Sequence, residues 1–352
     1  MNIRMKTALA AVCLCIVMTG CSNSDQSSKN DASSADSQVT TTTAAAESEV
    51  SEKETDTSGE DPQNTEPDKK PVDDSEIAKL AEEIEKKYGV DIVYGNDIRT
   101  DYSTDDDSDV LKARAYTDAA GIKNALEQVN EGLRVFPSGL LEKLTSEDGS
   151  PMKIYLTGPV GMNGSAPQDG AIPAFTDDHD KETYLVIDIS LNGDINIPTV
   201  CHEITHIIDF TLQRMGKFDD KKWDSLNPAG FAYTEDYDNY GNSAAAQKHS
   251  YTSEHYSPRV PAEGQTDDDL YFYYYYSTVN AYEDRATLLE NLIIYLLWDY
   301  EVAPGLYSYP HIYEKAKFFL DCISSAFELD DDGFRKWQDT LDKLAVTSKK
   351  PE

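Results

Sequence analysis

Residues 200 to 210 read VCHEITHIIDF, with two histidines four positions apart around a glutamate. On a helix, His202 and His206 would project from one face, where both imidazoles can bind one metal ion. Glu203 would lie beside them, placed to polarise a metal-bound water without being a ligand itself. Neutral imidazole suits zinc, which in catalytic sites takes three protein ligands and keeps one position for water. The alternative is a helix whose histidines lie on a solvated or packed face, and the pattern favours the metal site.

The extended pattern HExxHxxGxxH does not supply the third ligand, because Asp209 and Leu212 occupy its last two conserved positions. Asp209 lies one turn beyond His206, so it could accept the outer N–H of a ligating imidazole or, less favourably, bind the ion itself. Glu283, within YYSTVNAYEDRATLLENL, is the stronger candidate. Asn280 precedes a predicted helix there, so Glu283 could equally be a capping-box residue that faces the backbone.

The elements around these residues are predicted from hydrophobic spacing. An apolar stripe of Val200, Ile204, Ile207 and Ile208, followed by Gly216, predicts a helix that carries the histidines. Upstream, the patterns predict helices over 74 to 89, 118 to 133 and 137 to 144, and strands over 90 to 95, 152 to 158 and 182 to 190. Strands that lead into the histidine helix favour an α+β fold with a small sheet beside that helix.

The second half of the chain divides into a polar and a helical part. Residues 217 to 269 are rich in Tyr, Asn, Ser and Asp, and only 221 to 226 have a short helical pattern. Long irregular segments within a compact domain are often functional. Apolar spacing then predicts helices near 281 to 299, 311 to 328 and 332 to 345.

The N-terminus has the layout of a secretory signal, with Arg4 and Lys6 before the apolar stretch TALAAVCLCIVM. The run VMTGC resembles a bacterial lipobox, which implies a signal peptide over 1–20 and a lipid on Cys21. The alternative is an ordinary signal peptide with an incidental cysteine. Residues 21–73 contain few large apolar side chains, so we expect a disordered, acidic, Ser/Thr-rich tether, followed by one folded domain over 74–352.

The formal net charge of −34 at pH 7 argues against nucleic acid as a partner, because phosphate contacts need clustered lysine and arginine. The same charge repels an anionic bilayer, so membrane attachment would depend on the lipid at Cys21. Cys201 and Cys322 would remain after the signal is removed. Two buried thiols are favoured over a single disulfide between them.

The motifs HEITH and Y-x-T-x-N-x-x-E-D-x-A together resemble the glutamate-zincin metallopeptidases, in particular a family of zinc-binding metallopeptidase lipoproteins from anaerobic bacteria. They are more distantly similar to the group of the proline-specific secreted endopeptidase and anthrax lethal factor. The resemblance implies a zincin-like domain in which Glu283 is the third zinc ligand and Tyr276, seven residues earlier, donates to the oxyanion. In two respects the chain departs from the family. Thr287 stands where an acid is common, and the interval from His206 to Glu283 is long.

These expectations combine into peptide hydrolysis by a monomeric, lipid-anchored zinc endopeptidase at the cell surface, outside the cytoplasm. Glu203 would take the proton of the Zn²⁺-activated water, and Tyr276 would stabilise the oxyanion. The strand within 184 to 190 could bind an extended polypeptide substrate by edge pairing. One rival is a surface lipoprotein that binds zinc or another ligand without turnover, and another is an interaction protein on a decayed peptidase fold. The intact Glu203 favours the enzyme.

The remaining histidines have no partner at ligand spacing in the sequence. They are His179, His249, His255 and His311. Each is expected at a surface or in a loop, and His249 and His255 lie in the polar segment, from which they could approach the site.

Overall fold

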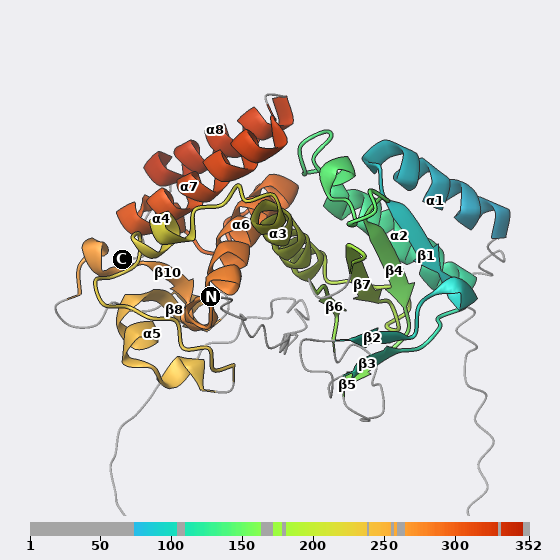
Figure 1. The fold of residues 1–352 in the computed structure, drawn as a ribbon, viewed down its shortest axis with the longest axis horizontal. Coiled ribbons are helices and arrows are strands. Elements are labelled where there is room, and N and C mark those ends of the chain that lie inside the picture. The colour runs from blue at the N-terminus through green and yellow to red at the C-terminus, as the bar shows by residue number, and fades with distance from the viewer. Residues whose placement is uncertain are drawn as a thin grey trace, which may run out of the picture. The chain divides into compact units, whose positions relative to one another are not determined.

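The computed structural model describes residues 74–103, 110–162, 172–177, 181–237, 239–254, 257–258, 265–329 and 332–347 (Figure 1). Several expectations lie outside these residues: the signal peptide over 1–20, the lipidated Cys21, the tether over 21–73, His179 and His255. Within the described part of the chain, no helix is both long and apolar enough to cross a membrane.

A four-stranded sheet packs beside the histidine helix. Its strands lie in the order β1 (Asp91–Tyr94), β4 (Lys153–Thr157), β7 (Tyr184–Asp188) and β6 (Ala174–Phe175). The first three run parallel, whereas β6 pairs antiparallel with β7 and forms the edge. All five residues of β7 are buried, which is typical of an interior strand covered on both faces.

The expectation that residues 184 to 190 offer a free sheet edge to a substrate is wrong. β7 pairs with β4 on one side, where Leu185 faces Ile154, and with β6 on the other, where Ile187 faces Ala174. Its backbone hydrogen-bonding groups are therefore used within the sheet. The edge on this side of the sheet belongs to β6, a strand of two residues that is too short to show an alternating pattern in the sequence, and β1 forms the other edge.

Two further layers cover this sheet. Helices α1 (Asp74–Tyr88) and α2 (Ala119–Leu133) pack together, and α2 also contacts the histidine helix α3 (Ile197–Arg214). A small antiparallel sheet contains β2 (Asp101–Ser103), β3 (Val110–Ala113) and β5 (Val160–Met162). The ring of Tyr102 lies 5.3 to 5.8 Å from the rings of Phe175, Tyr184 and Tyr155, so an aromatic cluster joins the small sheet to the larger one.

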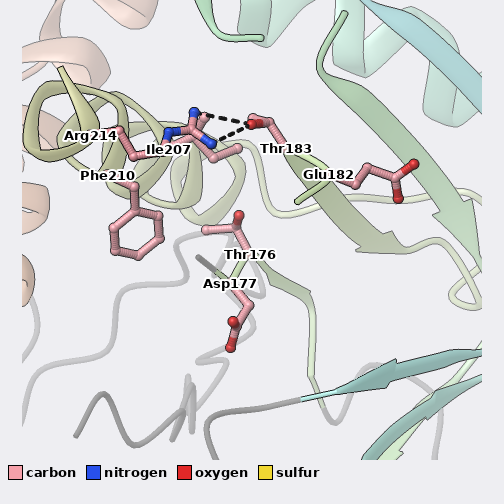
Figure 2. Close-up of a pocket in the computed structure, with 7 residues that line it drawn as sticks. All are labelled: Thr176, Asp177, Glu182, Thr183, Ile207, Phe210 and Arg214. Atoms are coloured by element: carbon pink, nitrogen blue, oxygen red, sulfur yellow. Dashed lines mark hydrogen bonds between the residues drawn. The ribbon is translucent and has the colours of Figure 1, made fainter. Parts of the chain in front are cut away.

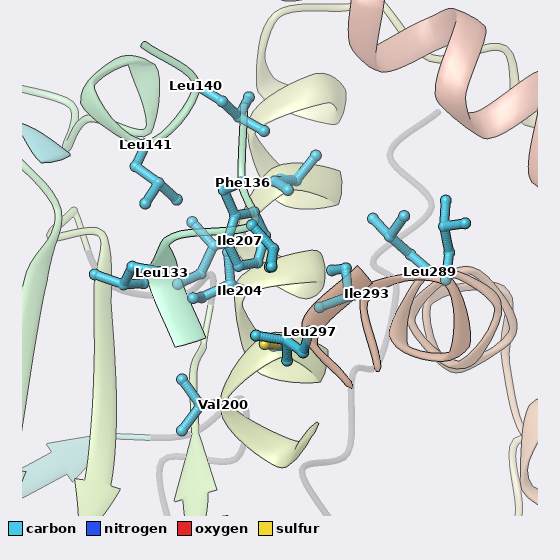
Figure 3. Close-up of a cluster of buried hydrophobic side chains, with 14 of the residues drawn as sticks. Leu133, Phe136, Leu140, Leu141, Val200, Ile204, Ile207, Leu289, Ile293 and Leu297 are labelled. Carbon is cyan, nitrogen blue, oxygen red and sulfur yellow. The ribbon is translucent and has the colours of Figure 1, made fainter. Parts of the chain in front are cut away.

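Helix α6 (Ala281–Trp298) packs directly against α3. Each helix starts at an asparagine, since the side chain of Asn196 accepts from Thr199 N at 3.3 Å and that of Asn280 accepts from Glu283 N at 2.9 Å. Figure 3 shows the apolar contact, in which α3 lies between α6 and the segment that follows α2. The labelled side chains are Val200, Ile204 and Ile207 of α3, Leu289, Ile293 and Leu297 of α6, and Leu133, Phe136, Leu140 and Leu141.

The C-terminal helices α7 (Pro310–Phe327) and α8 (Asp332–Thr347) pack on α6, so the predicted helical C-terminal part is confirmed. The polar segment 217 to 269 contains more regular structure than expected. α4 (Asp220–Asp224) matches the predicted short helix, but the structure adds α5 (Ala244–His249), β8 (Ser250–Glu254) and β9 (Ser257–Pro258). β8 pairs with β10 (Phe272–Tyr274), a partner distant in sequence that local patterns do not reveal.

Short 3-10 helices occur at Gly95–Asp97, Leu141–Lys143, Tyr240–Asn242, Asp267–Asp269, Tyr275–Thr278 and Leu306–Ser308. The mixture of helices with small sheets confirms the α+β fold class. Cys201 and Cys322 are both free; Cys201 is buried as expected, whereas Cys322 is only partly buried.

Candidate metal centre

Three side chains proposed as zinc ligands meet between α3 and α6. His202 Nε2 lies 3.1 Å from Glu283 Oε2 and 3.1 Å from His206 Nε2, and His206 Nε2 lies 3.4 Å from Glu283 Oε2. Zinc bonds of about 2.0–2.1 Å in a tetrahedron separate the ligand atoms by about 3.3 Å. The three atoms therefore have the spacing that tetrahedral zinc requires, and their side chains fit the ion.

Glu203 completes a buried group with the two histidines, because polar atoms of these three residues lie within 4.8 Å of one another. His202, His206 and Glu283 are each 7% exposed, and Glu203 is 5% exposed. A metal ion at this place would be shielded from most of the solvent, which strengthens its electrostatic effect on bound groups.

The two roles considered for Glu283 turn out to be compatible. Its backbone N–H donates to the Asn280 side chain, which caps α6. Its carboxylate does not return to the backbone of Asn280 but faces the histidines through Oε2, while Oε1 accepts from the hydroxyl of Tyr276 at 2.9 Å. The cap thus fixes the first turn of α6 and leaves the carboxylate available to a metal.

The charges in this group favour an anionic Glu283. Burial alone would raise the pKa of Glu283, but the charges and hydrogen bonds of His206 and His202 outweigh it and lower that pKa. Burial alone would lower the pKa of His202, yet its hydrogen bonds to Glu283 and Glu290 raise the pKa well above the usual value. A metal that binds His202 would therefore displace a proton.

Glu290 orients His202 from the opposite side and was missed in the sequence. Its Oε2 lies 3.1 Å from His202 Nδ1, so the carboxylate can hold Nε2 toward the ligand cluster. The available signal was spacing, because Glu290 follows Glu283 by two helical turns on the same face of α6. Thr287, at the position where the family often has an acid, instead contacts Ser277 through their hydroxyl oxygens at 2.8 Å.

Asp209, proposed as a partner of an imidazole, forms a buried ion pair with Arg285. Both side chains are 1% exposed, and the pair joins α3 to α6 close to the ligands. The described residues show no hydrogen bond between Asp209 and His206, whose Nδ1 is buried without a partner there. The Arg285 guanidinium also lies 4.5 Å from the ring centre of Phe218 and 4.9 Å from that of Tyr282.

A second buried ion pair lies next to the first. Lys315 of α7 donates to Asp284 at 2.7 Å, and both side chains are fully buried. The same Asp284 oxygen accepts from the hydroxyl of Tyr233 at 2.8 Å, and that hydroxyl accepts from Trp223 Nε1 at 2.9 Å. This network joins α6, α7 and the segment after α3, so three parts of the chain are held around the ligand helices.

Glu203 has the environment of a general base. Burial raises its pKa to about 7, while the nearby histidine charges and the backbone N–H of Thr176 act in the opposite direction. A carboxylate with this pKa can both accept and return a proton near neutral pH.

A small pocket lies between α3 and the segment that connects β6 to β7 (Figure 2). Arg214 donates to Thr183 Oγ1 across it at 3.2 to 3.3 Å. Phe210 forms another part of the lining, and its ring stacks on His206 at 6.0 Å between ring centres. The pocket therefore adjoins a proposed ligand; its lining residues are Thr176, Asp177, Glu182, Thr183, Ile207, Phe210 and Arg214.

His249 and His311 both pack against Tyr271 rather than at the metal centre. The ring of His311 stacks on Tyr271 at 3.9 Å, and His249 meets it edge-on at 5.5 Å. His249 Nδ1 lies 2.7 Å from the Asp269 carbonyl oxygen. Neither histidine belongs to a metal-binding group among the described residues.

The chain has few matches among known proteins. No protein-family model and no curated protein matches the chain. A crystal structure of a candidate zinc-binding metallopeptidase from Bacteroides caccae is similar, with 14% sequence identity and a TM-score of 0.43. The similarity covers 77% of this chain and 94% of that one.

We predict that Glu290→Gln weakens zinc binding about 10- to 100-fold, because the substitution removes the carboxylate that orients His202. Zinc affinity is measured by competition with a chelator of known affinity. Glu314→Gln, at an exposed position of α7, is the matched control and should bind zinc as the wild type does. Equal zinc affinity of Glu290→Gln and wild type would contradict the orienting role.

We predict that Asp209→Asn lowers the free energy of unfolding by about 3–5 kcal/mol, because Arg285 is left as an unpaired buried charge. The double variant Asp209→Leu/Arg285→Met should lose less, since no charge then remains buried. Urea denaturation of the three proteins provides the measurement. A double variant less stable than Asp209→Asn would show that the ion pair is not the source of the effect.

We predict that Glu203→Gln stabilises the zinc-free protein at alkaline pH. The carboxyl pKa is about 7 in the folded chain against an ordinary 4.5, so its ionisation disfavours folding as the pH rises through this interval. The variant should therefore be more stable by about 3 kcal/mol at pH 8 and little changed at pH 4.5. Urea denaturation with a chelator present measures both values, and a pH-independent difference would be the contrary result.

Proposed function

We propose that the chain is a zinc-dependent endopeptidase. The observation that carries the proposal is the triangle formed by His202 Nε2, His206 Nε2 and Glu283 Oε2, with edges of 3.1 to 3.4 Å, beside the buried Glu203. A site that only stored zinc could use Glu290 to orient His202 but would have no need of Glu203 in the position of a general base. The presence of Glu203 favours the peptidase over a lipoprotein that binds zinc without turnover.

The proposed roles follow from these positions. His202, His206 and Glu283 would hold Zn²⁺, which when bound supplies a Lewis acid and lowers the pKa of water toward neutrality. Glu203, buried beside the two histidines, accepts the proton of the attacking water and returns it to the leaving amine. Tyr276, whose hydroxyl donates to Glu283 Oε1, is near enough to the ligands to donate instead to the carbonyl oxygen of the substrate.

The edge strand β6 and the neighbouring pocket would suit an extended polypeptide as substrate. β6 lies at the end of the sheet, and a peptide could add to it by backbone pairing. The pocket lined by Phe210, Arg214 and Asp177 begins just beyond β6 and beside α3, so it could receive a substrate side chain. Edge pairing at β6 replaces the earlier expectation for residues 184 to 190.

The location is proposed from the sequence alone. The basic and apolar residues of 1–20 support a signal peptide, and VMTGC supports a lipid on Cys21. The acidic segment 21–73 would then act as a tether that places a monomeric domain over 74–352 at the cell surface. The net charge of −34 makes nucleic acid an unsuitable partner.

We predict that Glu203→Gln keeps one zinc per chain but lowers kcat by about 10²–10⁴-fold, because the general base is removed while the ligands remain. Metal analysis and cleavage of a peptide library by wild type, variant and chelator-treated protein provide the measurement. The control Glu314→Gln should cleave like the wild type. Equal cleavage by Glu203→Gln would remove Glu203 from the mechanism, and zinc-loaded wild type that cleaves nothing would favour the binding protein.

A further inference from the structure

The polar segment after α4 brings a tyrosine to the metal centre. Its backbone runs beside the residues that precede α6, because Thr234 N donates to Thr278 O at 3.0 Å and Glu235 N donates to Val279 O at 2.9 Å. Tyr237 lies two residues after Glu235. The segment is thereby fixed to the start of the helix that carries Glu283.

The turn that leads to Tyr237 has a costly conformation. Glu235 has a φ of 51°, in the left-handed region that a glutamate seldom occupies. Such a conformation costs on the order of 1 kcal/mol and persists where surrounding contacts enforce it. Here the two backbone bonds to the 278–279 segment enforce it, and the chain reverses so that Tyr237 can reach Asn280.

Hydrogen bonding determines which way the Tyr237 proton points. The backbone N–H of Glu283 donates to the Asn280 side chain at 2.9 Å. Only the amide oxygen, Oδ1, can accept this hydrogen bond, because the amide nitrogen is a donor. The Asn280 amide nitrogen is therefore the atom that lies 2.6 Å from the Tyr237 hydroxyl, and it donates to that oxygen. The phenolic proton of Tyr237 remains for another acceptor, and the described residues show none.

Tyr237 packs beside Tyr276, the tyrosine whose hydroxyl reaches a proposed metal ligand. Its ring lies 6.2 Å from the ring of Tyr276, whose hydroxyl contacts Glu283 at 2.9 Å. Burial raises the pKa of Tyr237, the charges of Glu283, Glu235 and Glu203 raise it further, and the hydrogen bond from Asn280 acts in the opposite direction. The contact with Asn280, which caps α6, places the hydroxyl beside the first turn of the helix that carries Glu283.

We propose that Tyr237 is a second hydroxyl donor of the active site, which donates its phenolic proton in a hydrogen bond to the carbonyl oxygen of the scissile peptide. The inference rests on the proposed peptidase function. Tyr276 would approach that oxygen from the start of α6, and Tyr237 from the polar segment. Two hydrogen-bond donors would stabilise the negative charge that develops on this oxygen in the transition state. Both tyrosines are held in place by contacts within the protein, so little reorganisation is needed. The proton stays on Tyr237, and no covalent bond to this residue forms.

This role also accounts for the long interval between His206 and Glu283. The segment between these residues is held so that its backbone, Asn280 and the ring of Tyr276 fix the phenol of Tyr237. A hydroxyl that acts on a transition state needs such rigid support, since small displacements weaken its contribution.

Tyr237→Phe tests the proposal, because it keeps the ring and removes the donor. We expect kcat to fall by about 10- to 1,000-fold, with KM, zinc content and melting temperature close to the wild-type values. A phosphinic peptide, whose tetrahedral phosphorus imitates the transition state, should bind more weakly by a similar factor. Tyr275→Phe, at a neighbouring half-buried tyrosine, is the matched control and should change none of these quantities.

Other outcomes separate this proposal from the proposed function. Unchanged kcat and unchanged phosphinic-peptide affinity in Tyr237→Phe would overturn the role of Tyr237 alone. If a lower zinc affinity or a lower melting temperature of Tyr237→Phe accounts for the lost activity, Tyr237 has a structural role and the donor role is overturned. If the zinc-loaded wild type cleaves no peptide, the peptidase function fails, and phosphinic-peptide binding still decides whether the Tyr237 hydroxyl contacts a tetrahedral ligand.

Discussion

The buried ion pair between Asp209 and Arg285 sets the alignment of α3 with α6, and the metal centre depends on that alignment. Asp209 follows His206 by three residues and Arg285 follows Glu283 by two, so the pair lies one turn or less from ligands on each helix. A slip of one residue would move a ligand by about 1.5 Å along its helix axis and rotate it by about 100°. Apolar contacts such as those of Ile204 stabilise the packing of α3 on α6. The Asp209–Arg285 pair adds specificity, because a shifted alignment of the two helices would leave buried charges unpaired.

The centre also concentrates buried negative charge. Three carboxylates, from Glu203, Glu283 and Glu290, lie around two imidazoles. Burying carboxylates is unfavourable unless positive charge compensates them, and a divalent cation between His202, His206 and Glu283 would provide it. Binding of the ion and stability of the fold are therefore coupled. Burial is the main cause that raises the pKa of Glu203, and the charge of Glu283 adds to it.

Much of this arrangement could be predicted from the sequence, and the limits have physical causes. Long helices such as α1, α3 and α6 were predictable because apolar periodicity and capping residues act locally. The pairing of Asp209 with Arg285 and the orientation of His202 by Glu290 were not, since each depends on which helix faces which. The edge strand β6 and the pairing of β8 with β10 involve two to five residues and distant partners, which leave little local pattern. The sequence did not distinguish Tyr237 from the other tyrosines, because its contact with Asn280 depends on the fold.

The central claim is that His202, His206 and Glu283 bind one zinc ion with an open fourth position. X-ray absorption at the zinc edge of the purified, zinc-loaded protein tests it most directly. The account predicts one zinc per chain, four nitrogen or oxygen neighbours at about 2.0–2.1 Å, and the scattering signature of two imidazoles. A protein that retains no stoichiometric zinc, or zinc with sulfur neighbours or without imidazole, would contradict it.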